Sequence, residues 1–194
     1  MIYLDHNATT PPAPEVLAAM GPVYELAWAN ASSQHGPGQD AKRVLGAARA
    51  TAAKALGCKT SELIFTSGAT EANHMALLGL LTAAKVQGSQ RLLIGAVEHS
   101  ALLRLARSLA EQGVPVDFMP VSADGRIDLA AAAALMGPDL ALVSLMAANN
   151  ETGVLMPVAE VAAMAHAAGA AMHVDATQWI GKLPFAFADH PADA

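Results

Sequence analysis

Residues 140–175 decide the fold, and they read LALVSLMAANNETGVLMPVAEVAAMAHAAGAAMHVD. Residues 140–146 and 171–175 are nearly continuous apolar runs of strand length. Residues 158–168, between them, have apolar side chains at helical spacing and stop at Gly169. Apolar strands separated by a helix are typical of parallel strands that are covered on both faces. This stretch therefore predicts a strand–helix–strand unit.

The same alternation continues toward the N-terminus as far as about residue 60. It predicts further strands at 63–66, 91–95 and 116–119, and helices at 70–84, 99–111 and 128–136. Asp128 is suited to begin the last of these helices as its N-cap, and Gly113 to end the helix before it. The predicted fold class is α/β, with one mainly parallel sheet sandwiched by helices.

The first third of the chain has a different pattern. Prolines and a loop at 30–38 surround two predicted helices, at 14–27 and 39–56. We therefore divide the chain into residues 1–60, an N-terminal arm with helices, and residues 61–194, the α/β core.

Composition excludes several classes of protein. Of the 194 residues, 54% are hydrophobic and 14% are charged, which excludes a mainly disordered chain. A net charge of −6 and scattered arginines argue against a nucleic-acid surface. The single cysteine, Cys58, excludes a disulfide framework and a thiolate zinc cage. A short chain buries a smaller fraction of its surface than a long one, so this apolar composition predicts that some apolar surface is left for a partner.

The sequence also bears on location. No basic segment precedes the first apolar residues, and Asp5 interrupts them, so we expect no signal peptide. No stretch reaches the roughly 18 apolar residues of a membrane span. We expect a soluble, cytoplasmic protein.

Polar clusters follow the predicted strands, where open α/β sheets bind ligands. Ser67-Gly68-Ala69-Thr70-Glu71 is a turn of small residues that opens a helix. Its free N–H groups and the helix dipole are suited to a phosphate, although an ordinary helix N-cap explains the same residues. His99 and the pair Asn149-Asn150 follow two other strands; a solvated loop histidine and a turn are the simpler interpretations of these.

Asp175 ends an otherwise apolar strand. An isolated carboxylate is costly there, so a cationic partner is expected, and His173 lies on the same strand face. Together these features suit pyridoxal 5′-phosphate (PLP): a turn that can bind a phosphate, a histidine, an amide pair and a buried carboxylate. A carboxylate beside the ring nitrogen of PLP keeps that nitrogen protonated. A metal hydrolase that uses these histidines is disfavoured because no His-x-x-x-His pair is present. We predict no metal site.

The ordered motifs resemble the N-terminal half of the cysteine desulfurases, in the class V aminotransferase group of fold-type-I PLP enzymes. The resemblance predicts that the chain forms most of the large, cofactor-binding domain of that fold. The Ser-Gly-Ala-Thr-Glu form is similar to the branch that serves iron–sulfur cluster assembly. The matching stretches are residues 3–10, 30–35, 65–73, 98–99, 149–153, 173–178 and 181–184.

The resemblance implies a role for each motif residue. Ala69 and Thr70 would hold the cofactor phosphate, and His99 would stack on the ring and move protons. Asn150 would contact the ring-oxygen side and the substrate, Asp175 the ring nitrogen, and Gln178 the phenolic oxygen. Asn7 would border the substrate.

The implied reaction converts L-cysteine to L-alanine and passes sulfur, through an enzyme persulfide, to an acceptor or scaffold protein. Family members are homodimers. Alternatives are another class V enzyme, such as a selenocysteine lyase, and a non-catalytic or split-enzyme subunit. The family's Schiff-base lysine, persulfide cysteine and small C-terminal domain would all follow residue 194, so we expect this chain alone to be inactive and to bind PLP weakly.

Overall fold

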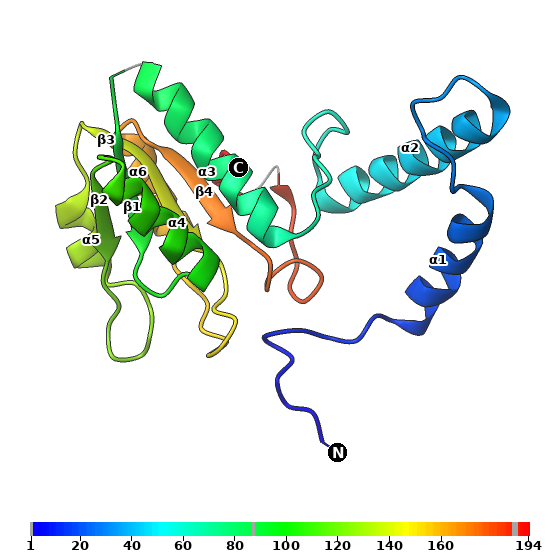
Figure 1. The fold of residues 1–194 in the computed structure, drawn as a ribbon. Helices are drawn as coiled ribbons and strands as arrows, with labels where there is room; N and C mark the ends of the chain where they lie inside the picture. The colour runs from blue at the N-terminus through cyan, green and yellow to red at the C-terminus, as the bar shows by residue number, and fades with distance from the viewer. Residues whose placement is uncertain (1, 87, 188–189) are drawn as a thin grey trace. The chain divides into compact units, whose positions relative to one another are not determined.

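The computed structural model describes residues 2–86, 88–187 and 190–194, and the chain divides into two compact units (Figure 1). The first comprises Met1–Ile64 with Ala186–Ala188, and the second comprises Phe65–Phe185 with Asp189–Ala194. The helices of the first unit are α1 (Pro14–Leu26) and α2 (Gly36–Leu56). The second unit contains the sheet and the remaining helices, and we describe each unit by itself.

A parallel four-stranded sheet forms the centre of the second unit, in the order β2-β1-β3-β4. Its strands are β1 (Arg91–Gly95), β2 (Val116–Met119), β3 (Leu140–Met146) and β4 (Ala171–Asp175). Every residue of β3 is buried, as expected for an inner strand covered on both faces. The predicted α/β class and these four strands are confirmed.

Helices cover both faces of the sheet (Figure 1). Leu92 and Ile94 of β1 pack with α3 (Ala69–Val86) and α4 (Ser100–Glu111). Leu93, between them in sequence, lies in the other core, with α5 (Leu129–Leu135) and α6 (Val158–Ala167). Neighbouring strand residues point to opposite faces, so a continuously apolar strand supplies both cores.

The predicted N-cap of α5 and the predicted glycines after α4 and α6 are also confirmed, whereas α2 begins at Gly36 and not at the predicted residue 39. Asp128 Oδ1 accepts hydrogen bonds from the N–H groups of Ala130 and Ala131, both at 3.0 Å, and so caps α5. Gly113 and Gly169 follow α4 and α6 with φ of 89° and 80°, a left-handed conformation that favours glycine.

The predicted strand at 63–66 is wrong. The segment joins no strand ladder among the described residues, and its apolar side chains are open to solvent, with Ile64 63% and Phe65 47% exposed. A strand exists only when a neighbour pairs with it. β4 is the edge strand of the sheet, and its backbone pairs with residues 193–194 instead of residues 63–66. Asp193 N–H donates to Met172 O at 2.8 Å, and Val174 N–H donates to Ala194 O at 2.9 Å.

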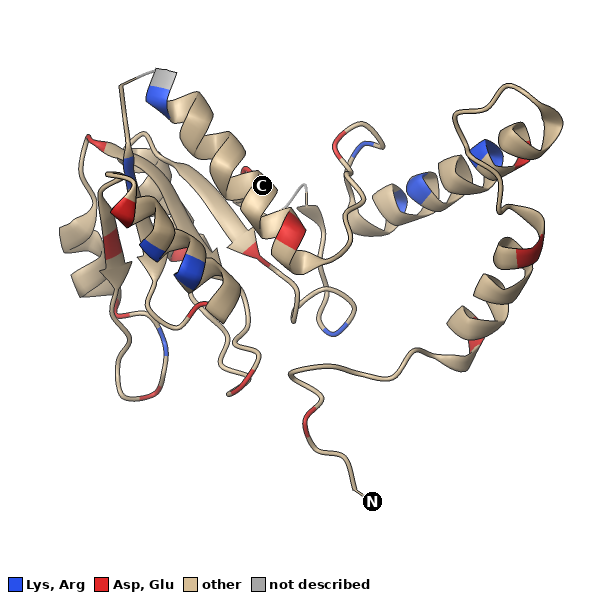
Figure 2. Cartoon of the chain, in the orientation of Figure 1, with Lys and Arg blue, Asp and Glu red and all other residues tan. Residues whose placement is uncertain are grey.

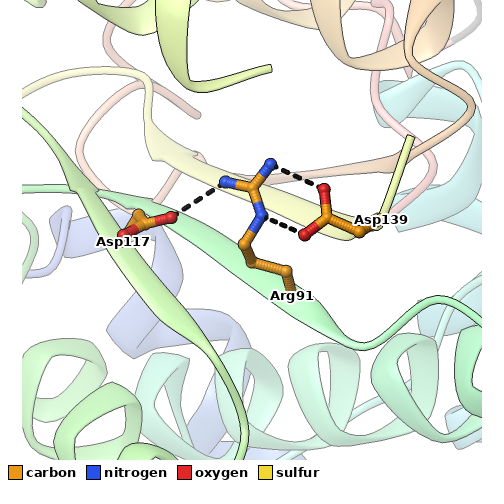
Figure 3. A network of polar contacts seen from close by, with 3 residues as sticks. All are labelled: Arg91, Asp117 and Asp139. Atoms are coloured by element: carbon orange, nitrogen blue, oxygen red, sulfur yellow. Dashed lines mark hydrogen bonds and ion pairs between the residues drawn. The ribbon is translucent and has the colours of Figure 1, made fainter. Parts of the chain in front are cut away.

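An ion-pair network links the amino ends of β1 and β3 to β2 (Figure 3). Arg91 donates from Nε and Nη2 to the two carboxylate oxygens of Asp139, at 2.8 and 3.0 Å, and from Nη1 to Asp117 at 2.9 Å. These contacts raise the pKa of Arg91 and lower the pKa of Asp139. The network lies at the opposite ends of the strands from the predicted site.

In the first unit, α1 is apolar without being buried. Its large apolar side chains are between 42% and 74% exposed: Val16, Leu17, Met20, Val23, Tyr24 and Leu26. It carries no Lys or Arg, whereas several are spaced along α2 (Figure 2). Within the described part of the chain, no helix combines the length and the apolar character that a membrane crossing requires.

Candidate functional site

The second unit holds all but one of the predicted site residues. His99 follows β1, Asn150 follows β3, and Asp175 and Gln178 lie at and after the end of β4. Ala69 and Thr70 open α3, and Asn73, one turn further along this helix, bonds to Asp175 of β4. The sheet is parallel, so the carboxyl ends of β1, β3 and β4 share one edge. This edge, with the start of α3, is the candidate site.

Asp175 is the most constrained polar residue at this edge. It is only 7% exposed, and its Oδ2 accepts a hydrogen bond from Asn73 Nδ2 at 2.7 Å. Its Oδ1 accepts from the N–H and the hydroxyl of Thr177, at 3.0 and 2.6 Å. These donors are all neutral. They fix the carboxylate in position and leave its negative charge uncompensated.

His173 does not take the role of an ion-pair partner that the strand pattern left open for it. Its Nδ1 lies 2.9 Å from Ser144 Oγ, in a hydrogen bond between β4 and β3. Burial lowers the pKa of His173 to about 4, although the nearby charge of Asp175 opposes this. The ring is therefore neutral at physiological pH. The cationic partner expected for Asp175 is not among the described residues that bond to it.

The start of α3 has two features. The first intrahelical bond runs from Ala72 N–H to Gly68 O, so the N–H groups of Ala69 and Thr70 precede the hydrogen-bond ladder. Glu71 turns back to accept bonds from the N–H and the hydroxyl of Ser67, both at 2.6 Å, which lowers its pKa. Glu71 thus fixes the turn that precedes the helix, while two N–H groups and the exposed Thr70 side chain remain in place for an anion.

His99 is the N-cap of α4. Its Nδ1 accepts a hydrogen bond from Ala101 N–H at 3.2 Å, which leaves Nε2 to carry the ring proton. The bond fixes one edge of an otherwise exposed imidazole. A histidine so anchored can present its ring face to a ligand at the strand ends.

The two adjacent asparagines have different surroundings. Asn149 is buried, and its Oδ1 accepts bonds from the N–H groups of Glu151 and Thr152, both at 2.9 Å. Its Nδ2 donates to Val97 O at 3.2 Å, which ties the loop after β3 to the loop after β1. Asn150 is half-buried and makes no side-chain hydrogen bond to another described residue. Asn149 builds the loop, and Asn150 is the one available to a ligand.

Gln178 and Asn7 complete the predicted set. Gln178 is half-buried, and its Oε1 accepts a hydrogen bond from Lys182 Nζ. Asn7 belongs to the first unit, where it lies in an exposed turn at 6–8. No three His, Cys, Asp or Glu side chains in the described ranges gather as a metal centre would require.

Sequence reasoning missed two residues that build the site. Asn73 reaches Asp175 from 102 positions away, and no local pattern predicts such a contact. Thr177 lies two residues after Asp175, where a hydroxyl commonly bonds back to a carboxylate. The spacing of these two residues could therefore have predicted this contact.

Comparison with known proteins identifies the family. The model of the family "Aminotransferase class-V" matches residues 2–194. A cysteine desulfurase of Cereibacter sphaeroides is 46% identical over 185 residues, which cover 94% of this chain and 47% of the relative. A cysteine desulfurase of Rhodobacter capsulatus is 46% identical over 194 residues, covering 99% of this chain and 50% of the relative.

Solved structures agree with this assignment. A NifS-like protein superposes with a TM-score of 0.90 at 35% identity, covering 97% of this chain and 52% of the other. The structure "SspA in complex with cysteine" gives a TM-score of 0.90 at 30% identity, covering 98% and 55%. The chain spans about half the length of the curated relatives it matches. With a family match over its whole length and a superposable fold, the chain belongs to the class-V aminotransferase family.

Proposed function

We propose that this chain is the cofactor-binding half of a PLP-dependent cysteine desulfurase. The observation that carries the proposal is Asp175, a buried carboxylate held at the end of β4 by neutral donors, in a chain 46% identical to cysteine desulfurases. A buried negative charge that the surrounding residues leave uncompensated suits a cationic ligand group.

PLP fits the residues at this edge of the sheet. Its protonated ring nitrogen would compensate the negative charge of Asp175. Its phosphate would accept hydrogen bonds from the N–H groups of Ala69 and Thr70 at the start of α3. His99 would stack on the ring, and Gln178 would donate a hydrogen bond to the ring oxygen. The bond between Asn73 and Asp175 supports this assignment, because it ties the anion-binding turn to the carboxylate.

Each protein group then has a defined task. Bound PLP supplies an electron sink for bonds at the substrate's α-carbon. Asp175 holds the proton on the ring nitrogen, and the Asn73 and Thr177 bonds orient that carboxylate. His99, which carries its proton on Nε2, is placed to move protons, and Asn150 borders the L-cysteine substrate.

The same proposal covers partners. We infer that the complete protein works as a homodimer and hands sulfur to an acceptor or scaffold protein for iron–sulfur cluster assembly. Support comes from relatives named cysteine desulfurase IscS and from the apolar surface of α1, which no described residue buries.

Joining residues 1–194 to the second half of the Rhodobacter capsulatus relative tests the proposed activity. The relative's own full-length enzyme is the matched control. The chimera is expected to bind PLP and to release alanine and sulfide from L-cysteine in the presence of a thiol reductant. A chimera that binds PLP and turns over selenocysteine but not cysteine would assign a different class V reaction. A folded chimera without PLP binding would overturn the proposal.

The chain by itself gives a second measurement. We expect reversible PLP binding in an absorbance titration, and intact mass after borohydride treatment should show no defined adduct. A stoichiometric adduct on Lys182 would contradict the assignment of the Schiff-base lysine to the half of the enzyme that this chain does not span.

A further inference from the structure

Glu98 is a buried carboxyl group that the proposed mechanism does not use. It precedes His99 in the loop after β1 and is only 4% exposed. Its Oε1 accepts a hydrogen bond from Met146 N–H at 2.6 Å, whereas its Oε2 is buried with no hydrogen-bond partner among the described residues. A Cβ on Gly95 would lie 2.8 Å from Oε1, so the strand end has a glycine where the carboxyl packs.

The position of Glu98 explains why a polar side chain is buried here. Met146 is the last residue of β3, and the paired strand β1 ends at Gly95. The N–H of Met146 therefore takes its acceptor from a side chain, and the Glu98 carboxyl extends the ladder by one hydrogen bond. The contact fastens the loop that carries His99 to the end of β3.

Burial and the charge of Asp175 determine the protonation state of Glu98. A carboxylate with one hydrogen bond and a bare second oxygen is costly to bury, and a neutral carboxylic acid far less so. Burial raises the pKa of Glu98 well above its usual range, the Met146 bond opposes this, and the negative charge of Asp175 raises it further. Asp175, on β4, is the one titratable group among the described residues that acts on it.

We propose that Glu98 is a positioning residue held as a neutral carboxylic acid, which anchors the His99 loop and leaves Asp175 as the negative charge of this cluster. The two acids have different surroundings. Asp175 receives three hydrogen bonds, which suit a carboxylate, while Glu98 receives one and has a second oxygen with no partner among the described residues. The anchoring concerns the chain alone; only the benefit to a bound ring nitrogen rests on the proposed function.

Carbon-13 labelling of the glutamate side-chain carboxyls in the full chain tests the protonation state directly. The pH titration is expected to leave one glutamate carboxyl resonance at its protonated shift near pH 7. Glu98→Gln should remove that resonance, and Glu111→Gln, at the exposed end of α4, should not. If every glutamate resonance reaches its ionised shift by pH 6 in the folded wild type, the proposal is overturned, and this result needs no variant to fold.

Unfolding equilibria of wild type and Glu98→Gln give a second, independent readout. Native Glu98 keeps a proton that the unfolded chain loses above about pH 4.5, so wild-type stability should fall as pH rises, relative to the variant. The ratio of the two unfolding constants should change by up to about tenfold per pH unit. A ratio that is flat with pH, or that changes in the opposite direction, contradicts the proposal.

Both measurements use the chain without added PLP. Glu98 can therefore prove ionised while PLP still binds, or prove neutral while PLP does not. The two results separate failure of this inference from failure of the proposed function.

Discussion

Asp175 combines burial, three neutral donors and a position at the carboxyl end of β4. Its shape and its charge can be separated by experiment. An asparagine keeps the size of the side chain and one acceptor oxygen but removes the negative charge.

Asp175→Asn is expected to reduce turnover of the completed enzyme by about ten- to a hundredfold, the equivalent of one charge-assisted hydrogen bond of about 1.5–3 kcal/mol. The rate per folded, cofactor-loaded site should be measured beside a melting curve. Asp40→Asn, which removes a carboxylate from an exposed ion pair on α2, is the control and should change neither quantity.

A purely structural Asp175 would give the reverse pattern. The variant would then melt at a lower temperature, because the Asn73 and Thr177 bonds are disturbed, and its folded fraction would turn over at the normal rate. That outcome would end the assignment of Asp175 to the ring nitrogen.

At the scale of elements, the Arg91 network joins the amino ends of three strands through one guanidinium (Figure 3). Its two parallel bonds to Asp139 need the planar fork of arginine, which lysine lacks. The register of β1 and β3 shifts between Arg91 and Leu92, beside this contact.

Arg91→Lys is therefore expected to lower the melting temperature by about 2–4 °C, because a single ammonium cannot serve both carboxylates. Circular dichroism of the full chain during heating measures the melting temperature. Arg107→Lys, on the exposed side of α4, is the matched control. Equal melting temperatures for both variants would indicate that the network contributes nothing measurable.

Elements were more predictable than contacts. The four strands are largely apolar, and short apolar runs between helices are typical of buried parallel strands. The segment 63–66 has the same composition and is not a strand, because pairing depends on a neighbour that local sequence does not specify. In the site, strand-end positions follow from topology, but the Asn73 contact and the buried state of Glu98 depend on tertiary packing.

At the scale of the whole molecule, apolar surface is the main departure from an ordinary small protein. The side chains of α1 are exposed along its length, although most of them are apolar. Large exposed apolar patches mark interfaces or aggregation sites.

We predict that the chain forms dimers or larger species in solution, as measured by light scattering over a range of concentrations. Leu17→Lys with Tyr24→Lys, two charges on exposed positions of α1, should shift the distribution toward monomer. Lys42→Glu on α2 changes charge without removing apolar area and serves as the control. A monomeric wild type at high concentration would contradict the prediction.

His173 and Glu98 give the folded chain opposite responses to pH. With its pKa lowered to about 4, His173 stays neutral while the unfolded chain protonates, so its contribution to stability is lost as pH falls from about 6.5 toward 4. The contribution of Glu98 is lost as pH rises above about 4.5, since its native pKa is raised. Between these limits the two slopes have opposite signs.

Near pH 5.5, then, unfolding releases one proton from Glu98 while His173 takes one up, roughly in balance. In calorimetry, the heat of unfolding of the wild type should depend on the ionisation heat of the buffer by about one proton less than the heat of unfolding of Glu98→Gln does. In Glu98→Gln the exchange is broken, net proton uptake remains, and the measured heat should vary with the buffer. Folding thus removes a proton from His173 on β4 and leaves one on Glu98 in the loop after β1, so these two groups together exchange almost no protons with the solvent.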